Sequence, residues 1–279
     1  CSMSHISFTW SIVRRQRAHL RATGVVRHAV RWWAPGSSRS RTELASGALG
    51  ARPSVSERPD SWRGVYVAAG VSFVLAALFS LLSVLVIVGQ TASADHALIV
   101  WLRAFSSPLL TSVLLAVTFT SGKLALPVAI LFAALLYRNA PRTALYYAAA
   151  CLSAQLLNAF LKHEIARPRP HGVSPKLTAA GGYAYPSADV MMAVVIFALG
   201  AMLLSREIES LRLRVLVRAA SALFVVAAAV ARVYLGAHWP SDVLGGVLAG
   251  ASASAFWVAA LDAHDRRHGA LPLSPIVDA

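Results

Sequence analysis

An apolar stretch runs from Val65 to Gly89 without a single charged side chain. A helix of about 20 apolar residues crosses the hydrocarbon core of a bilayer, so this stretch is long enough to span a membrane. Of the 279 residues, 57% are hydrophobic and only 14% are charged, which is outside the range of ordinary soluble domains. A soluble all-helical core is the alternative, but an uncharged run of this length argues against it. We therefore expect an all-α protein, a polytopic bundle of membrane helices.

The charge of the chain is strongly basic, with 26 Lys and Arg against 12 Asp and Glu and a formal net charge of +14. Such a balance can indicate nucleic-acid binding. The arginines, however, concentrate in the first 63 residues and in short loops, as the positive-inside rule predicts for cytoplasmic segments of membrane proteins. We predict a bilayer and no nucleic acid as partner. The two cysteines, Cys1 and Cys151, imply no disulfide framework.

The N-terminal part of the chain differs in composition from the rest. Residues 1–62 are rich in Arg and Ser, and no acidic residue precedes Glu43. We predict a basic, disordered cytoplasmic arm here, with an interfacial amphipathic helix or a transit-like segment at 11–33 as the alternative. The membrane domain is expected at 63–262 and a cytoplasmic tail at 263–279.

A polar block at 231–242 joins two apolar runs in the second half of the chain. It contains Arg232, His238 and Asp242. If a helix begins near Pro240, His238 and Asp242 lie one turn apart, so the carboxylate can hold one ring nitrogen and leave the other free as a nucleophile. A histidine packed at a helix end, with Asp242 as a cap, would give the same pattern.

Two further polar blocks carry groups that suit a phosphate. At 162–170, Lys162 ends an apolar run and Arg169 follows seven residues later in a Pro-rich turn. At 185–189, the sequence Tyr-Pro-Ser-Ala-Asp places the hydroxyl of Ser187 and free backbone N–H groups at the start of the next apolar run. A helix N-terminus at this point favours anions.

Together the three blocks resemble the type 2 phosphatidic acid phosphatase and haloperoxidase superfamily. Its pattern is K-x6-R-P, then P-S-G-H, then S-R-x5-H-x3-D, and the order and internal spacings match over roughly residues 65–261. There are three departures from the pattern. Ala231 stands in place of the Ser and Ala188 in place of the Gly, which are mild changes. Asp189 stands in place of the His of the second block, which is not mild.

The resemblance implies a role for each matching residue. His238 would be the nucleophile that forms a phosphohistidine, and Asp242 would orient it. The residues that would bind the phosphate are Lys162, Arg169, Ser187 and Arg232. Two nearby residues, Arg167 and His171, match no motif, and we expect both to face solvent, with contact to the substrate as the alternative. We also expect no metal ion and no cofactor, because no ligand cluster has metal spacing and the cations can replace Mg²⁺.

Asp189 would be the third catalytic residue. The family's His at this position is thought to protonate the leaving group and then to help activate water. An Asp carboxyl has an ordinary pKa of about 3.9, and neighbouring cations favour its charged form. An ionised Asp189 can accept a proton from water but cannot donate one to a departing alkoxide.

Six membrane spans follow from the apolar runs and the loop charges. The region 109–137 is interrupted at Ser121-Gly122-Lys123 and could be one broken span or two short ones. The three polar blocks need a common face, and the basic loops 138–142 and 206–218 belong in the cytoplasm. Both conditions are met only if region 109–137 crosses the membrane once in total. The two termini then lie in the cytoplasm. The expected spans are 65–89, 109–137, 143–162, 187–204, 214–235 and 240–261.

Smaller patterns predict contacts between these spans. Residues 95–105 are expected to form a short amphipathic helix at the membrane interface, with Trp101 at the headgroup level. Gln155, Asn158 and Lys162 form a polar stripe that we expect to face other helices. Gly246, Gly250 and Ser254 recur every four residues, which predicts close helix packing.

The function that these observations favour is a lipid phosphatase of a bacterial inner (plasma) membrane, with its active site on the extracytoplasmic face. Because Asp189 is a poor acid, we expect a prenyl diphosphate such as the undecaprenyl carrier to be a better substrate than phosphatidate. One alternative is a lipid phosphotransferase that uses the same intermediate. Another is a catalytically impaired relative that binds lipid phosphates. The soluble haloperoxidases of the superfamily are disfavoured by the six spans, and the oligomeric state stays open.

Overall fold

The computed structural model describes residues 62–171 and 181–268, which form helices and the turns between them. The predicted arm at 1–62 therefore lies almost entirely outside the described residues. At the other end, α10 continues to His268, past the boundary expected at residue 262. The longer helices are α2 (Arg63–Ile87), α3 (Ala92–Arg103), α4 (Pro108–Gly122), α5 (Ala125–Asn139), α6 (Pro141–Ile165), α9 (Leu211–Tyr234) and α10 (Pro240–His268).

Within residues 62–171 and 181–268, five helical segments are long and apolar enough to cross a membrane. They are Arg63–Ile87, Pro141–Ile165, Ala188–Glu207, Leu211–Tyr234 and Pro240–His268. The helices α4 and α5 pass the same test together and are bent by 57° at their junction, so that counting the pair as one broken span gives six. This confirms the predicted all-α membrane bundle. The break falls where Ser121-Gly122-Lys123 interrupts the apolar sequence, since α4 ends at Gly122.

The composite span, Ala188–Glu207, consists of four short helical segments rather than one regular helix. It begins with α7 (Ala188–Ala193), widens into the π-helix η3 (Val194–Leu199), and continues as α8 (Gly200–Leu204) and the 3₁₀-helix η4 (Ser205–Glu207). This segment is the most buried of the five spans, since 61% of its most apolar stretch lies inside the protein. The other helices therefore pack around it.

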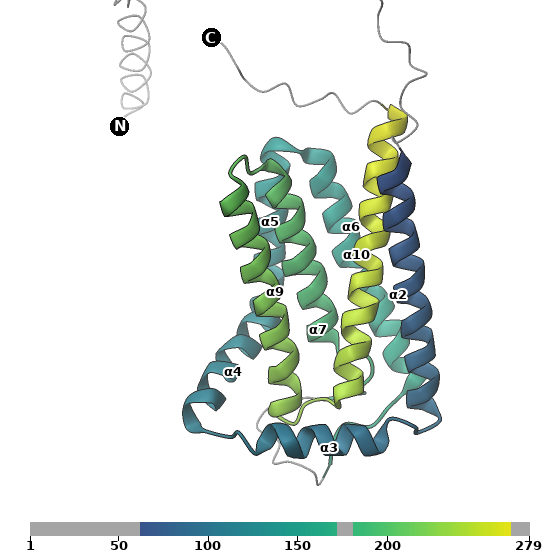
Figure 1. The fold of residues 1–279 in the computed structure, drawn as a ribbon, viewed down its shortest axis with the longest axis vertical. Coiled ribbons are helices and arrows are strands. Elements are labelled where there is room, and N and C mark those ends of the chain that lie inside the picture. Colours follow the sequence, from purple (N-terminus) through teal and green to yellow (C-terminus); the bar gives the residue numbers. More distant parts are fainter. Residues whose placement is uncertain (1–61, 172–180, 269–279) are drawn as a thin grey trace, which may run out of the picture. The chain divides into compact units, whose positions relative to one another are not determined.

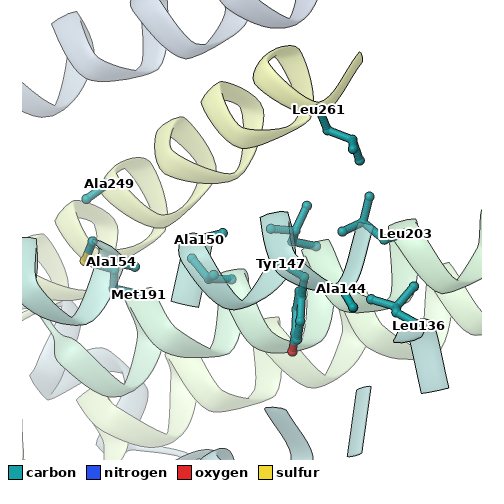
Figure 2. Packing of buried hydrophobic residues seen from close by; sticks show 11 residues of the cluster. Leu136, Ala144, Tyr147, Ala150, Ala154, Met191, Leu203, Ala249 and Leu261 are labelled. Atoms are coloured by element: carbon teal, nitrogen blue, oxygen red, sulfur yellow. The ribbon is translucent and has the colours of Figure 1, made fainter. Parts of the chain in front are cut away.

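Small side chains allow the helices of the core to approach closely. The largest buried cluster combines alanines of α6 with residues of α5, the composite span and α10, and Figure 2 shows Tyr147 and Met191 among them. On α10, a Cβ added at Gly246 would lie 2.7 Å from the Ser187 carbonyl oxygen, and one at Gly250 would lie 2.8 Å from the Met191 carbonyl oxygen. The glycine repeat therefore packs closely against another helix, as the sequence predicted, and that helix is α7.

The helix α3 lies across the end of the bundle at which α9 ends and α10 begins (Figure 1). A helix was predicted at 95–105, and one side of α3 packs on the bundle, because Ile99 is fully buried while Val100 and Trp101 are about 60% exposed. One buried residue of α3 is charged: Asp95 is only 2% exposed. The C-terminal end of α6 and the N-terminal end of α7 come to the same end of the bundle, and this is where the three polar blocks meet.

Candidate active site

His238 lies in the turn between α9 and α10. The carbonyl oxygen of Arg232, in the last turn of α9, accepts hydrogen bonds from the backbone N–H groups of Ala237 and His238 at 3.1 and 3.2 Å. Gly236 has a φ of 71°, a conformation that glycine adopts without steric cost at a helix C-terminus. Pro240 then begins α10. This turn places a buried imidazole between two helix ends.

The imidazole of His238 faces Asp242 with one nitrogen and Arg169 with the other. Its Nδ1 lies 3.6 Å from Asp242 Oδ2, beyond hydrogen-bond distance, and that oxygen accepts the Trp239 backbone N–H at 2.8 Å. Its Nε2 lies 3.1 Å from Arg169 Nη1. A guanidinium can only donate, so Nε2 is the acceptor and the proton of a neutral ring is on Nδ1. This tautomer keeps the lone pair of Nε2 on the side of the cations.

His238 is neutral at physiological pH. Burial lowers its pKa from an ordinary value of 6.5 to about 4. The Asp242 carboxylate acts in the opposite direction and raises the pKa, while the positive charges of Arg169 and Lys162 lower it further. The neutral ring is the form that can act as a nucleophile, so the surroundings of His238 favour the reactive form.

Two of the predicted phosphate-binding cations are held by backbone carbonyl groups. Lys162 Nζ donates to the Tyr183 carbonyl oxygen at 2.7 Å. Arg169 donates to the carbonyl oxygens of Gly181 and Gly182 and, through Nη1, to that of Ala237 at 2.6 Å. A carbonyl orients a cation without neutralising its charge. These contacts therefore orient both side chains without pairing them with a carboxylate.

The third cation, Arg232, forms an ion pair with Asp189. Gly122, at the end of α4, lies beside this ion pair. A Cβ added there would lie 3.7 Å from Arg232 Nη2 and 3.8 Å from Asp189 Oδ1. Arg232 Nε and Ser187 Oγ are buried and have no hydrogen-bond partner in the described protein. Unpartnered buried donors are costly, so both are suited to an incoming phosphate oxygen.

The structure brings the predicted site residues to one end of the bundle. Lys162, Arg169 and Arg232 lie close enough to interact electrostatically with one another, and two of them also act on His238. Ser187 joins them from the start of α7, where its backbone N–H donates to the Asp242 carbonyl oxygen at 3.0 Å. Three clustered cations repel one another, and a phosphate would relieve that repulsion. Metal independence remains a prediction, although no cluster of three metal-ligand side chains occurs in the described ranges.

The prediction for Arg167 is wrong. We expected it to face solvent, but its side chain is only 14% exposed and forms ion pairs with both Asp95 and Asp242. These partners are 72 and 75 residues away along the chain, so no local pattern pointed to them. The signal available in the sequence was Asp95, a carboxylate in an apolar helix that needed a cation. His171 is exposed, as expected.

Comparison with known proteins agrees with this fold. Residues 143–266 match the family model of the PAP2 superfamily. The fold is similar to that of a transmembrane PAP2-type phosphatidylglycerolphosphate phosphatase from Bacillus subtilis, with a TM-score of 0.62 and 24% identity over 70% of this chain and 96% of that one. Aquifex aeolicus LpxE is also similar, with a TM-score of 0.48 and 23% identity over 58% of this chain and 93% of that one. No curated protein matches by sequence.

The match includes all three polar blocks, from Lys162 to Asp242, and the similar crystal structure shares the arrangement of the helices. The resemblance seen in the sequence is therefore confirmed. The chain is an integral membrane protein, and its residues 143–266 match the PAP2 superfamily.

Proposed function

We propose that this protein is a lipid phosphatase that works through a phosphohistidine at His238. The observation that carries the proposal is the neutral, buried imidazole, whose Nε2 points toward a group of cations. Nε2 attacks phosphorus, and the bond from phosphorus to the leaving oxygen breaks with its electron pair on that oxygen. Water then attacks the phosphohistidine, the N–P bond breaks, inorganic phosphate leaves and the imidazole is restored. The proton of the attacking water passes to the carboxylate of Asp189.

Substrate binding requires one change in the site. Arg169 Nη1 now donates to His238 Nε2, and a phosphoryl group in line with that nitrogen must take its place. Arg169 is still anchored through Nε and Nη2 on the Gly181 and Gly182 carbonyls. We expect Nη1 to turn to a phosphate oxygen, where the charge that develops during attack is stabilised by preoriented donors. Ser187 Oγ and Arg232 Nε contact the other oxygens.

The ion pair between Asp189 and Arg232 favours a diphosphate as substrate. Pairing with a guanidinium stabilises the carboxylate, which has no proton to give to a leaving group. A lipid monophosphate releases an alkoxide and needs an acid. A lipid diphosphate releases a phosphate monoester, whose second pKa of about 6 lets it depart unprotonated. We therefore propose a prenyl diphosphate, such as the undecaprenyl carrier, as the preferred substrate.

A cavity of about 610 Å³ reaches from Asp189 into the membrane-spanning part of the bundle. It lies between the broken span of α4 and α5 on one side and α6 and α7 on the other, and most of its lining is apolar. The residues of α6 that line it are Tyr147, Ala148, Cys151, Leu152 and Gln155. An apolar cavity that ends at Asp189, beside Arg232, suits a lipid whose phosphate is bound by Arg232 and Arg169 and whose chain lies beside α6.

We expect Ala148→Trp to lower kcat/KM for a long-chain prenyl diphosphate about tenfold or more, because the indole would occupy the volume of the lipid chain. The water-soluble diphosphate of a single isoprene unit should be hydrolysed within about twofold of the wild-type rate. Ala76→Trp is the matched control, since Ala76 is also exposed and lines a separate cavity of about 470 Å³ between α2, α6 and α10. Equal losses on both substrates, or a larger loss in the control, would exclude the α4–α6 cavity as the chain site.

We further propose that the active site faces the extracytoplasmic side of a bacterial inner membrane, with both termini in the cytoplasm. The basic turns that connect α5 to α6 and the composite span to α9 lie at the end of the bundle opposite to α3 (Figure 1). Loops rich in Lys and Arg stay in the cytoplasm, so the positive-inside rule favours the outer face for His238.

Thiol labelling in intact cells tests this orientation. In a cysteine-free variant, Gly181→Cys should react with a membrane-impermeant maleimide, because Gly181 is exposed at the site and an added side chain meets nothing within 4 Å. Glu209→Cys is exposed at the opposite end and should react only after the membrane is permeabilised. Labelling of position 209 but not 181 in intact cells would place the active site in the cytoplasm.

A further inference from the structure

Arg167 connects three elements that are distant in the sequence. Its Nη2 lies 2.7 Å from Asp95 Oδ2 on α3, and its Nη1 lies 2.6 Å from Asp242 Oδ1 on α10. Nη1 also donates to Ser241 Oγ at 2.7 Å. The two nitrogens of the planar fork thus bind two carboxylates at once, which a lysine ammonium on a flexible stem cannot reproduce.

Asp95 fixes the start of α10 from outside that helix. Its Oδ1 accepts the backbone N–H of Ser241 at 2.8 Å, and its Oδ2 accepts Ser241 Oγ at 2.6 Å. The first N–H groups of a helix have no partner within the helix, so an acceptor from α3 acts here as a cap in trans. The carboxylate also stabilises the positive end of the helix dipole. The orientation of the first turn of α10 therefore depends on α3.

Asp242 is held at both oxygens. Oδ1 receives Arg167, while Oδ2 receives the Trp239 backbone N–H and lies near His238 Nδ1. The side chain of Asp242 is fully buried, so it cannot turn into water if one contact is lost. Arg167 also lies over the ring of Trp239, whose Nε1 donates to the Pro168 carbonyl oxygen. These contacts allow a single orientation of the carboxylate relative to the imidazole.

We propose that Asp95 and Arg167 are positioning residues, which act through Asp242 so that α3 sets the orientation of the His238 imidazole for in-line attack. This inference rests on the proposed function. Neither residue touches the phosphate. A misplacement of about 1 Å at a reacting group can cost about 100-fold in rate, so loss of this chain of contacts should reduce kcat rather than substrate affinity.

The experiment uses the full-length protein in detergent with a prenyl diphosphate as substrate. Arg167→Lys and Asp95→Asn should each lower kcat about 10- to 100-fold with KM within about threefold, since both keep similar volume but break the bridge. The losses in the double variant should be less than additive, because Asp95 and Arg167 share one ion pair. Arg206→Lys is the control. It alters the ion pair with Asp262, at 2.9 Å, in the part of the bundle away from the site.

The pH profile separates positioning from general damage to the fold. The charged groups that act on His238 are Asp242, which raises its pKa, and Arg169 and Lys162, which lower it. Activity requires the neutral ring, so the wild-type kcat/KM should fall as pH drops through about 4. Arg167→Gln removes a cation that offsets the charge of Asp242. The carboxylate should then raise the pKa of His238 further, so the loss of kcat/KM at acid pH (the acid limb of the profile) should begin at a higher pH. Arg167→Lys keeps the charge, and its acid limb should stay in place.

The results that would refute the positioning role of Asp95 and Arg167 differ from those that would refute the proposed phosphatase. An inactive wild type, or an active His238→Ala variant, would refute the phosphatase itself. A wild type that needs His238, together with Asp95 and Arg167 variants as fast as Arg206→Lys, would overturn the positioning role. Additive losses in the double variant, or an unchanged acid limb in Arg167→Gln, would also overturn it. If Arg167→Gln does not fold, the kcat and KM values of Arg167→Lys and Asp95→Asn still test the positioning role.

Discussion

Replacing His238 by Ala should lower kcat by about 10⁴-fold or more, while the protein remains folded in the membrane. Removal of a covalent nucleophile eliminates the phosphohistidine route, and losses of this order or larger are typical. The side chain is only 2% exposed, so folding must be checked in parallel by the yield and the monodispersity of the purified variant.

The matched control is His163→Ala, which removes an exposed imidazole from the same end of α6 that carries Lys162. We expect this variant to keep activity within a few-fold of the wild type. Phosphate release by His238→Ala within tenfold of the wild type would exclude a bond between this residue and phosphorus.

The second large effect is expected at Asp189. Asp189→His supplies the proton donor that the carboxylate cannot provide, and should raise kcat/KM for phosphatidate about 100-fold, at the lower end of the range for general acid catalysis. Hydrolysis of a prenyl diphosphate should change by less than about threefold, because its leaving group departs without a proton. The measurement is kcat/KM on both substrates for both proteins.

The ion pair with Arg232 makes a second variant necessary. Substitution of Asp189 also releases the guanidinium, which could improve phosphate binding without any acid. Asp189→Asn releases Arg232 in the same way but donates no proton at neutral pH. Because Asn also cannot accept the proton of the attacking water, the two variants are compared by the rate at which the phosphohistidine forms, which precedes the water step. A gain on phosphatidate in the His variant alone supports the acid role. Equal gains in both variants, or a wild type that is equally fast on phosphatidate and the diphosphate, would refute the proposed preference.

The membrane spans could be predicted from the sequence because the signal is local. In lipid, an uncharged run such as 65–89 can form all of its backbone hydrogen bonds within a helix. The structure has this helix at Arg63–Ile87. The break in the second span was visible in the same way, at Ser121-Gly122-Lys123. The glycine repeat of α10 also predicted close helix packing, although not its partner α7, where a Cβ added at Gly246 would lie only 2.7 Å from the Ser187 carbonyl oxygen.

The ion pairs of the site could not be predicted, because each joins residues that only the fold brings together. Arg232 and Asp189 come from different spans, and the sequence placed both near a phosphate without showing that they neutralise each other. Arg167 seemed to be an ordinary loop residue until α3 was placed across the end of the bundle. The composite span at 188–207 also has no visible sign in its apolar sequence, where a regular helix would have the same composition.

The central claim is that phosphorus becomes bound to His238. Rapid quench of the active protein with a ³²P-labelled prenyl diphosphate, followed by proteolysis under alkaline conditions, measures this directly. We predict an acid-labile, alkali-stable label on the peptide that contains His238, absent from His238→Ala and retained in His163→Ala. Turnover in the quenched sample without any label on that peptide, or with label on another residue, would contradict the mechanism.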